Sequence, residues 1–321
     1  MKNRLYIVFA VLIGLATACE QEVELDIPES EQQYVVEGYI EQDLPPFVIL
    51  TKTTPYFSPL TLASLEESFV HGAVITVNNG NYTDTLTEFS SDTLAVLIKA
   101  LEDSLNIDIN LIDLLGGEAA ALITKDFKFY VYTTVGMFGE VQKKYDLKIQ
   151  IGESSLSAST TIPLPIPVDS LWVTPHPSPE YSNLVLLNGR FSDPAGQDNF
   201  VRYFTQRNRG VFSPGYFQSV FDDHSLVDLD GQTFNFTLER GYTFIDDIDF
   251  KTFSYFERGD TIRLRWSMID EAHYDFWSSV EFDRSQTGNP FGRPALVKSN
   301  IKGGLGIWGG YGSSYHQLIT E

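Results

Sequence analysis

Short runs of apolar, β-branched and aromatic residues recur along most of the chain after residue 33, and turn residues separate them. Runs of this length and composition are typical of β-strands rather than helices. In the first half of the chain they cover residues 34–40, 47–51, 73–77, 82–89, 127–135, 145–151 and 156–162. Residues 78–81 (NNGN) suit a hairpin turn, because Asn and Gly tolerate positive φ. We therefore predict an immunoglobulin-like or prealbumin-like β-sandwich over residues 34–162.

A helical pattern interrupts these strands at about residues 92–117. Leu94, Leu97, Ile98 and Leu101 follow the i, i+3, i+4, i+7 spacing of one helix face. A second helical piece over residues 109–115 would end at two consecutive glycines. The pattern predicts a small helical insert in the first domain.

Three prolines, Pro163, Pro165 and Pro167, mark a stiff linker over residues 163–167. The linker predicts a domain boundary, with a second β-rich domain over residues 168–321. Its predicted strands are residues 170–173, 183–191, 199–207, 233–239 and 261–266. The fold class is therefore mainly β in both domains.

One helix is expected in the second domain, over residues 268–282. Ser267 and Asp270 have the spacing of a capping box. The expected apolar face consists of Ile269, Ala272, Phe276 and Val280. The closing stretch, residues 300–315, holds six glycines and three large aromatic residues. It is too glycine-rich to predict a regular element, and we expect a compact closing segment.

The first nineteen residues have a different pattern, with two basic residues, an apolar run and small residues directly before Cys19. This order is typical of a secretory signal peptide, and the cysteine after the small residues makes it a lipobox. We predict cleavage after residue 18 and lipid attachment to Cys19. An ordinary secretory signal with a chance cysteine is the alternative.

Residues 19–33 carry six acidic residues and few apolar ones, so we predict an extended acidic tether. An acidic patch directly behind a lipidated cysteine also resembles the signal that exports some outer-membrane lipoproteins to the cell exterior, and a plain solvated linker is the alternative. The whole chain of 321 residues has a net charge of −21. After cleavage, 20 basic residues would remain against 43 acidic ones, a net charge of −23. This charge repels phosphate backbones and argues against nucleic acid as a partner.

No motif in the chain predicts catalysis or a resident cofactor. Residues 304–309 satisfy G-x-G-x-x-G by letter, but too few residues follow for the helix and acidic ligand of a dinucleotide site. The five histidines stand singly, and the one cysteine is assigned to the lipid. Asp228 and Asp230 precede a glycine and are candidates for a calcium loop, with a solvated turn as the alternative. Among the aromatic residues, Trp308 and Tyr311 are candidates for contact with a ligand or partner.

Several segments resemble a known family of Bacteroidota lipoproteins. They are YVVEGYI at residues 34–40, GAVITV at 72–77, FSDPAGQDNFVRYF at 191–204 and GNPFGRPALVKSNIKGGLGIWGGYG at 288–312. They are similar to the opening, the Asp-Pro strand and the closing motif of domain of unknown function 4249. The helical insert departs from the family pattern.

The resemblance implies an outer-membrane lipoprotein that is often encoded beside a TonB-dependent receptor. It implies no catalytic residues. We therefore expect a lipid-anchored protein facing the cell exterior, acting as a non-enzymatic binding or accessory subunit of such a receptor or of another outer-membrane assembly. The alternatives are a surface enzyme that processes glycans or peptides, and a free glycan-binding module.

Overall fold

The computed structural model describes residues 31–55, 58–59, 61–94, 96–97, 99, 128–223, 229–242, 249–286 and 296–321. The predicted signal peptide, Cys19, most of the tether and residues 101–117 of the predicted insert lie outside these ranges. Residues 32–321 form one compact unit. Nearly half of the chain is strand, so the predicted mainly-β class is confirmed.

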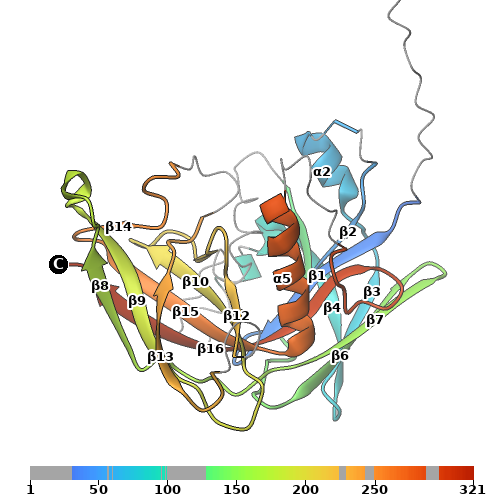
Figure 1. The fold of residues 1–321 in the computed structure, drawn as a ribbon. Coiled ribbons are helices and arrows are strands. Elements are labelled where there is room, and N and C mark those ends of the chain that lie inside the picture. The colour runs from blue at the N-terminus through green and yellow to red at the C-terminus, as the bar shows by residue number, and fades with distance from the viewer. Residues whose placement is uncertain are drawn as a thin grey trace, which may run out of the picture. The chain divides into compact units, whose positions relative to one another are not determined.

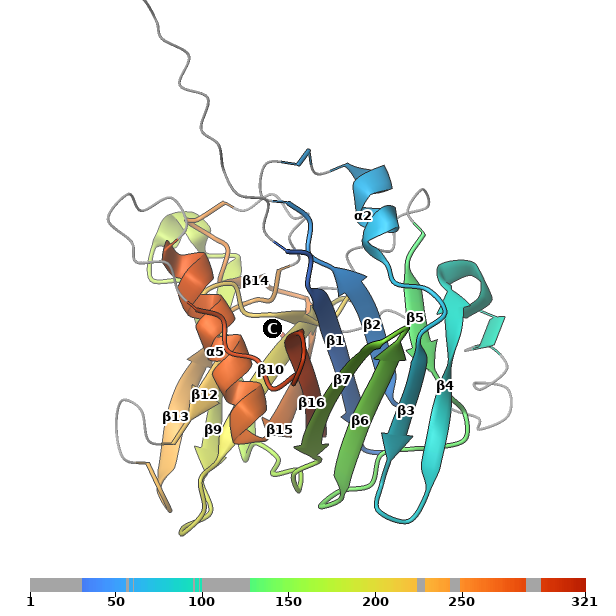
Figure 2. The same cartoon turned by 90° about the vertical axis from the view of Figure 1, so that its right-hand side faces the viewer.

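The first half of the unit is a strongly curled sheet around a hydrophobic core (Figures 1 and 2). Its strands are β1 (Tyr34–Glu41), β2 (Phe47–Lys52), β3 (Val74–Asn78), β4 (Thr83–Ser90), β5 (Tyr130–Thr133), β6 (Lys144–Ile151) and β7 (Ser154–Thr161). All seven predicted strands are present, with shifted ends. They lie in the order β1-β2-β5-β4-β3-β6-β7. Alternate side chains of these strands point inward, as the period of two requires.

Helical segments cover part of the outer face of this sheet. Helix α2 (Leu62–Ser68) begins at Thr61, whose side chain accepts a hydrogen bond from the Ser64 N–H. The described residues between 91 and 99 are also helical, which agrees with the start of the predicted insert. Leu94 and Leu97 of that segment pack with Phe47, Phe69 and Phe129. The described part of the helical stripe, Leu94 and Leu97, therefore faces the sheet, while Ile98 and Leu101 lie outside the described residues.

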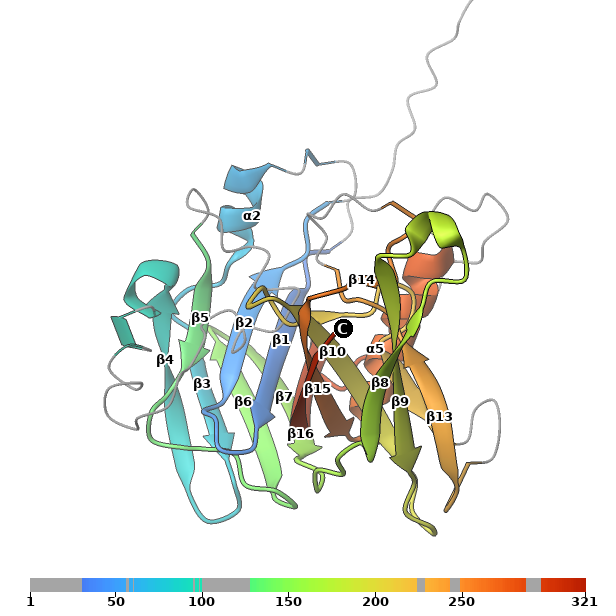
Figure 3. The same cartoon turned by 90° about the vertical axis from the view of Figure 1, so that its left-hand side faces the viewer.

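The second half stacks a four-stranded sheet on an extension of the first (Figure 3). The four strands are β8 (Ser170–Pro175), β9 (Leu184–Ser192), β13 (Thr233–Leu238) and β14 (Phe256–Glu257), and a short 3₁₀ turn, η1 (Pro179–Tyr181), joins β8 to β9. The opposing layer contains β10 (Phe200–Arg207), β11 (Ser213–Pro214), β12 (Val220–Asp222), β15 (Thr261–Ile269) and β16 (Leu305–Ile319). Aromatic and aliphatic side chains fill the space between the two layers.

Strand β16 belongs to both halves of the chain. Residues 305–311 pair in parallel with β1, and residues 312–319 pair antiparallel with β15. A twelve-stranded sheet therefore takes strands from both sides of the proline-rich segment 163–167. The two-domain division of the sequence stays a prediction, because pairing within one sheet does not say whether either half folds alone.

The expectation that residues 300–315 form no regular element is wrong, since most of them lie in β16. The glycines allow close approach of other segments to this strand. Gly306 has φ +104°, and a methyl group there would overlap the Val36 carbonyl oxygen. A methyl group at Gly309 would overlap the His273 ring, and one at Gly310 would meet the Thr161 carbonyl oxygen at 2.6 Å.

Helix α5 (Glu271–Gln286) starts three residues later than predicted. It lies on the side of the β10–β15–β16 layer that faces away from the four-stranded sheet, as Figure 2 shows. Ser267 belongs to β15, so the predicted capping box is wrong. Asp270 caps the helix, because its Oδ1 accepts a hydrogen bond from the His273 N–H at 2.9 Å. His273 and Trp277 are the buried residues of the helix. Phe276 and Val280 of the predicted apolar face pack against the cluster that contains Trp277 and also Ile269 at the end of β15, whereas Ala272 is exposed.

Candidate binding cleft

A cleft of about 460 Å³ opens where one strand ladder of the four-stranded sheet is interrupted. Along the same side of β9, strand β13 ends with the pair Leu238–Leu187 and β14 begins with the pair Phe256–Val185. Leu186 lies between these two pairs. The aromatic cleft is lined by Leu186, Tyr203, Gln218, Phe221, Thr237, Glu239, Phe250, Lys251, Phe253, Ser254 and Tyr255. Its volume is within the range of about 300–1,000 Å³ typical of small-molecule sites.

Local hydrogen bonds hold the two ends of the segment that leaves the ladder. The Arg240 N–H donates to the Ser254 carbonyl oxygen at 3.2 Å, which closes the base of the segment. Asp249 organises the following turn, because its Oδ1 accepts from the Lys251 N–H at 3.0 Å. The aromatic residues after Asp249 are thereby held at the mouth of the cleft.

Four aromatic side chains form an aromatic patch beside the cleft: Tyr216, Phe217, Phe250 and Phe253. Ring centroids of neighbouring members lie 4.9–6.2 Å apart, mostly edge to face. Phe250 is 63% exposed and Phe217 is 51% exposed. Aromatic rings that gather at the surface beside a cleft indicate a binding site more than isolated exposed rings do.

Glu239 is the carboxylate of the described lining. Its Oε2 accepts a hydrogen bond from the Phe217 N–H at 3.1 Å, which joins it to the backbone of the aromatic patch. Burial raises the pKa of the Glu239 carboxyl above its ordinary value, while the backbone N–H groups of Phe217 and Tyr216 oppose the rise.

Tyr203 closes the floor of the cleft from the opposing layer. Its hydroxyl oxygen accepts from the Glu239 N–H at 3.2 Å, and its ring stacks on Phe221 with centroids 5.6 Å apart. Burial holds the pKa of the Tyr203 phenol well above its ordinary value. Tyr203 is therefore a neutral hydrogen-bonding group under physiological conditions.

The chain also contains a buried polar network, which is structural. Arg265 Nη2 and Glu41 Oε2 form an ion pair at 2.5 Å, and the Tyr315 hydroxyl donates to Glu41 Oε1 at 2.8 Å. Both charged side chains are at least 95% buried. A ligand has no access to them, so the network joins β1, β15 and β16 rather than forming a site.

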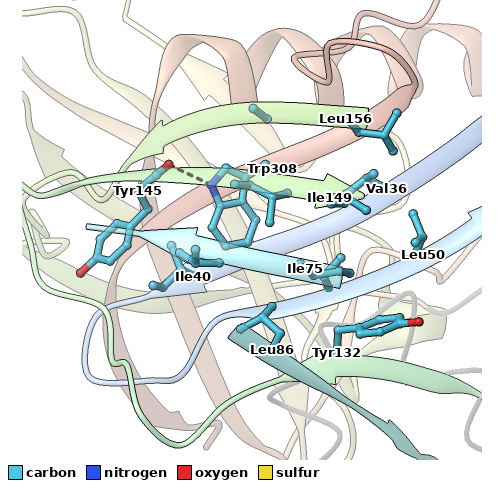
Figure 4. Close-up of a cluster of buried hydrophobic side chains, with 14 of the residues drawn as sticks. Val36, Ile40, Leu50, Ile75, Leu86, Tyr132, Tyr145, Ile149, Leu156 and Trp308 are labelled. Atoms are coloured by element: carbon cyan, nitrogen blue, oxygen red, sulfur yellow. Dashed lines mark hydrogen bonds between the residues drawn. The ribbon is translucent and has the colours of Figure 1, made fainter. Parts of the chain in front are cut away.

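Trp308 and Tyr311 are interior residues, contrary to the sequence-based expectation that they contact a partner. Trp308 is 0% exposed, and its indole Nε1–H donates to the Tyr145 carbonyl oxygen at 3.1 Å, as Figure 4 shows. Tyr311 is also buried, and its hydroxyl accepts from Arg202 Nη1 at 2.9 Å. Both faces of their strand are covered, because Trp308 lies in the core of the first half and Tyr311 packs in the cluster beneath α5.

The calcium candidates are only partly described. Asp228 lies outside the described residues. Asp230 Oδ1 accepts from the Gly196 N–H at 2.6 Å, which ties its turn to the loop after β9. Within the described ranges, no group of three His, Cys, Asp or Glu side chains is placed to hold a metal. A calcium loop at Asp228 and Asp230 stays a prediction.

Sequence similarity places the chain in a family. The profile described as Domain of unknown function (DUF4249) matches residues 20–316. The chain belongs to this family. Residues 34–40 and the described part of residues 288–312, the segments that resemble the family's opening and its closing motif, lie far apart in the sequence. They meet in the sheet, because β1 and β16 pair along one ladder.

No curated protein matches this DUF4249 chain. In the part that the structure describes, no helix combines the length and the apolar character that a membrane span needs.

Of the residues that line the aromatic cleft, Tyr203 lies in the segment 191–204 that resembles the family, but the sequence did not indicate a site there. Phe217, Glu239 and Phe250 belong to no recognised motif, and the chain is 13% aromatic, so surface rings do not stand out from core rings. The available signal was the group of Phe and Tyr residues at 250–256 beside an Asp-rich turn. It did not reveal which of these rings are exposed.

Proposed function

We propose that this protein is a lipid-anchored outer-membrane protein facing the cell exterior. In this proposal it acts as a non-enzymatic binding or accessory subunit of a TonB-dependent receptor or of another outer-membrane assembly. The lipobox at Cys19, the acidic tether and membership of the DUF4249 family support the location. The observation that carries the binding role is the aromatic cleft with its exposed patch.

The lining of the cleft favours binding over hydrolysis. Glycoside hydrolases use two carboxyl groups about 5–9.5 Å apart. Among the described lining residues, Glu239 is the only carboxylate. The raised pKa of Glu239 nevertheless favours one alternative, a surface enzyme with Glu239 as a general acid. That enzyme would turn over a glycan or peptide and lose its activity in Glu239→Gln, whereas a binding protein produces no product at all.

The anchor can be tested by fractionating cells that produce the wild-type protein or Cys19→Ser. We expect the wild-type protein in the outer-membrane fraction and incorporating labelled palmitate. Cys19→Ser should give a folded protein without label outside the membrane fraction. A variant that stays in the membrane fraction would contradict lipid anchoring through this residue.

The partner can be tested by affinity purification of the lipidated protein from gently solubilised membranes. We expect an outer-membrane barrel of the TonB-dependent type to co-purify in several detergents. The amount of barrel that co-purifies can then be compared for two surface variants, Phe217→Ala and Phe282→Ala. The first removes a ring of the aromatic patch, and the second removes a similarly exposed ring on α5. Recovery of a monomer under all conditions would reject the accessory role.

A further inference from the structure

We infer that the aromatic cleft binds an uncharged glycan, with sugar rings on the aromatic patch and sugar hydroxyls at the polar lining. This inference rests on the proposed binding function and names the chemical class of its ligand.

The aromatic patch offers apolar surface that has no partner within the described residues. Phe250 lines the cleft and is mostly exposed, and Phe217 lies on the neighbouring loop before β12. Aromatic rings fix ligand orientation at little entropic cost, because each has only two rotatable side-chain bonds. The C–H faces of sugar rings match such surfaces, while the hydroxyls at the ring edges remain available for hydrogen bonds.

The polar lining mixes donors and acceptors within one cleft. Glu239, Thr237, Gln218 and Ser254 contribute a carboxyl, two hydroxyls and an amide. The Thr237 hydroxyl already donates to Asn188 Oδ1, and Gln218 Nε2 already donates to the Val220 carbonyl oxygen. Both groups keep acceptor oxygens, and a sugar hydroxyl can donate to these or pair with Glu239 and Ser254. A purely apolar ligand would leave the half-buried Glu239 carboxyl without compensation for its lost hydration, which costs binding free energy.

Charge separates the remaining ligand classes. The described lining carries one acidic and one basic residue, Glu239 and Lys251, so it is not specialised for ligands of either charge. A chain with a net charge of −21 repels polyanionic ligands over longer distances. Lys251 at the cleft repels a cationic ligand, and Glu239 repels an anionic one. An uncharged, hydroxyl-rich ligand meets neither repulsion.

The geometry of the gap also disfavours an extended peptide. Peptides that add to a sheet need several consecutive backbone groups along a free edge. Here only Leu186 lies between the residues that pair with β13 and β14. One residue of free edge does not support strand addition.

The test is calorimetric titration of the mature, non-lipidated protein with neutral hexasaccharides of glucose, mannose, xylose and galactose. We expect saturable binding of at least one of them. Phe250→Ala should raise its dissociation constant by about tenfold or more, as loss of an aromatic anchor does. Phe282→Ala, which removes a 54% exposed ring from α5, should leave the dissociation constant unchanged.

Three outcomes would overturn the glycan inference. One is the absence of binding across a broader array of neutral glycans, and another is equal binding by the wild-type protein and Phe250→Ala. The third is binding of an aromatic-rich peptide library that Phe250→Ala abolishes. If the wild-type protein still co-purifies with a barrel in those cases, the accessory role stands and only the ligand class is wrong. Loss of both glycan binding and co-purification would reject the proposed function as well.

Discussion

Glycine at a few positions of β16 decides whether this strand can sit at the centre of the sheet. Gly306 combines φ +104° with direct contact to the backbone of Val36, its partner in β1. Gly80, in the hairpin between β3 and β4, has a similar φ of +89°, but a methyl group added there would meet nothing within 4 Å. Alanine at Gly80 introduces only the strain of a positive φ, whereas alanine at Gly306 adds a clash with the backbone of β1. Comparing the two substitutions therefore distinguishes the two destabilising effects.

Gly306→Ala should lower the free energy of unfolding by at least about 3 kcal/mol, because conformational strain and a backbone clash add together. Gly80→Ala should cost about 1–2 kcal/mol, since only the left-handed conformation is penalised. Urea denaturation of the mature protein measures both. Equal losses for the two variants would mean that β16 and β1 separate easily.

Glu239 should make stability depend on pH in a defined direction. Its pKa in the folded protein lies above its ordinary value of 4.5, so the folded state binds the proton more tightly than the unfolded state. This contribution is fully present below pH 4.5 and is lost as the pH rises through the folded pKa. Glu239→Gln removes this pH-dependent loss of stability. The melting temperature of the variant minus that of the wild-type protein should therefore be larger at pH 7 than at pH 4. A difference that is constant from pH 4 to 7 would contradict the raised pKa.

At the scale of elements, α5 is fixed to the sheet at its N-terminus. Asp270 Oδ2 accepts from the Thr160 hydroxyl at 2.6 Å and from the Thr161 N–H at 3.2 Å, while Oδ1 caps the helix. One side chain thus joins the start of α5 to the end of β7.

Asp270→Ala should lower the free energy of unfolding by about 2 kcal/mol, the upper range for an N-cap, because hydrogen bonds to β7 are lost as well. Asp275→Ala is the control on the same helix, since it removes only the exposed ion pair with Lys298. It should cost less than about 1 kcal/mol. Chemical denaturation monitored by circular dichroism measures the loss of unfolding free energy in both variants. If Asp270→Ala costs no more than Asp275→Ala, α5 is held mainly by its buried face.

Most strands could be predicted from the sequence because short runs of apolar, β-branched and aromatic residues between turn residues are typical of strands. Strands β11, β12 and β14 are only two or three residues long and leave no pattern. Strand β16 was missed because its glycines serve contacts with segments such as Thr161 and His273, which lie far away in the sequence. The aromatic cleft was missed for the same reason, since the exposure of Phe250 depends on where β13 ends and β14 begins.

At the scale of the whole molecule, one sheet and one buried ion pair connect the two halves of the chain. β16 supplies Trp308 to the core of the first half and pairs with β15 in the second. The Glu41–Arg265 pair spans the same junction. The shared sheet and ion pair favour one cooperative unfolding transition of residues 34–321, whereas two independent domains, as the proline-rich linker predicts, would give two transitions.

Glu41→Gln tests this connection, because it leaves the buried Arg265 charge without its carboxylate. The loss should be about 3–5 kcal/mol. Lys144→Ala removes an exposed ion pair with Asp146 and should cost less than about 1 kcal/mol. Calorimetry should give a single transition for both variants. Two separated transitions in Glu41→Gln would mean that the halves are independent domains.

The central claim is that the aromatic cleft between β13 and β14 is the place where this protein binds. Amide hydrogen exchange of the mature protein, with and without the tightest-binding neutral oligosaccharide, tests it most directly. We predict slower exchange on binding for residues 215–219 and 249–255, with no change in α5. Protection confined to other segments, or no protection at saturating oligosaccharide, would contradict the claim.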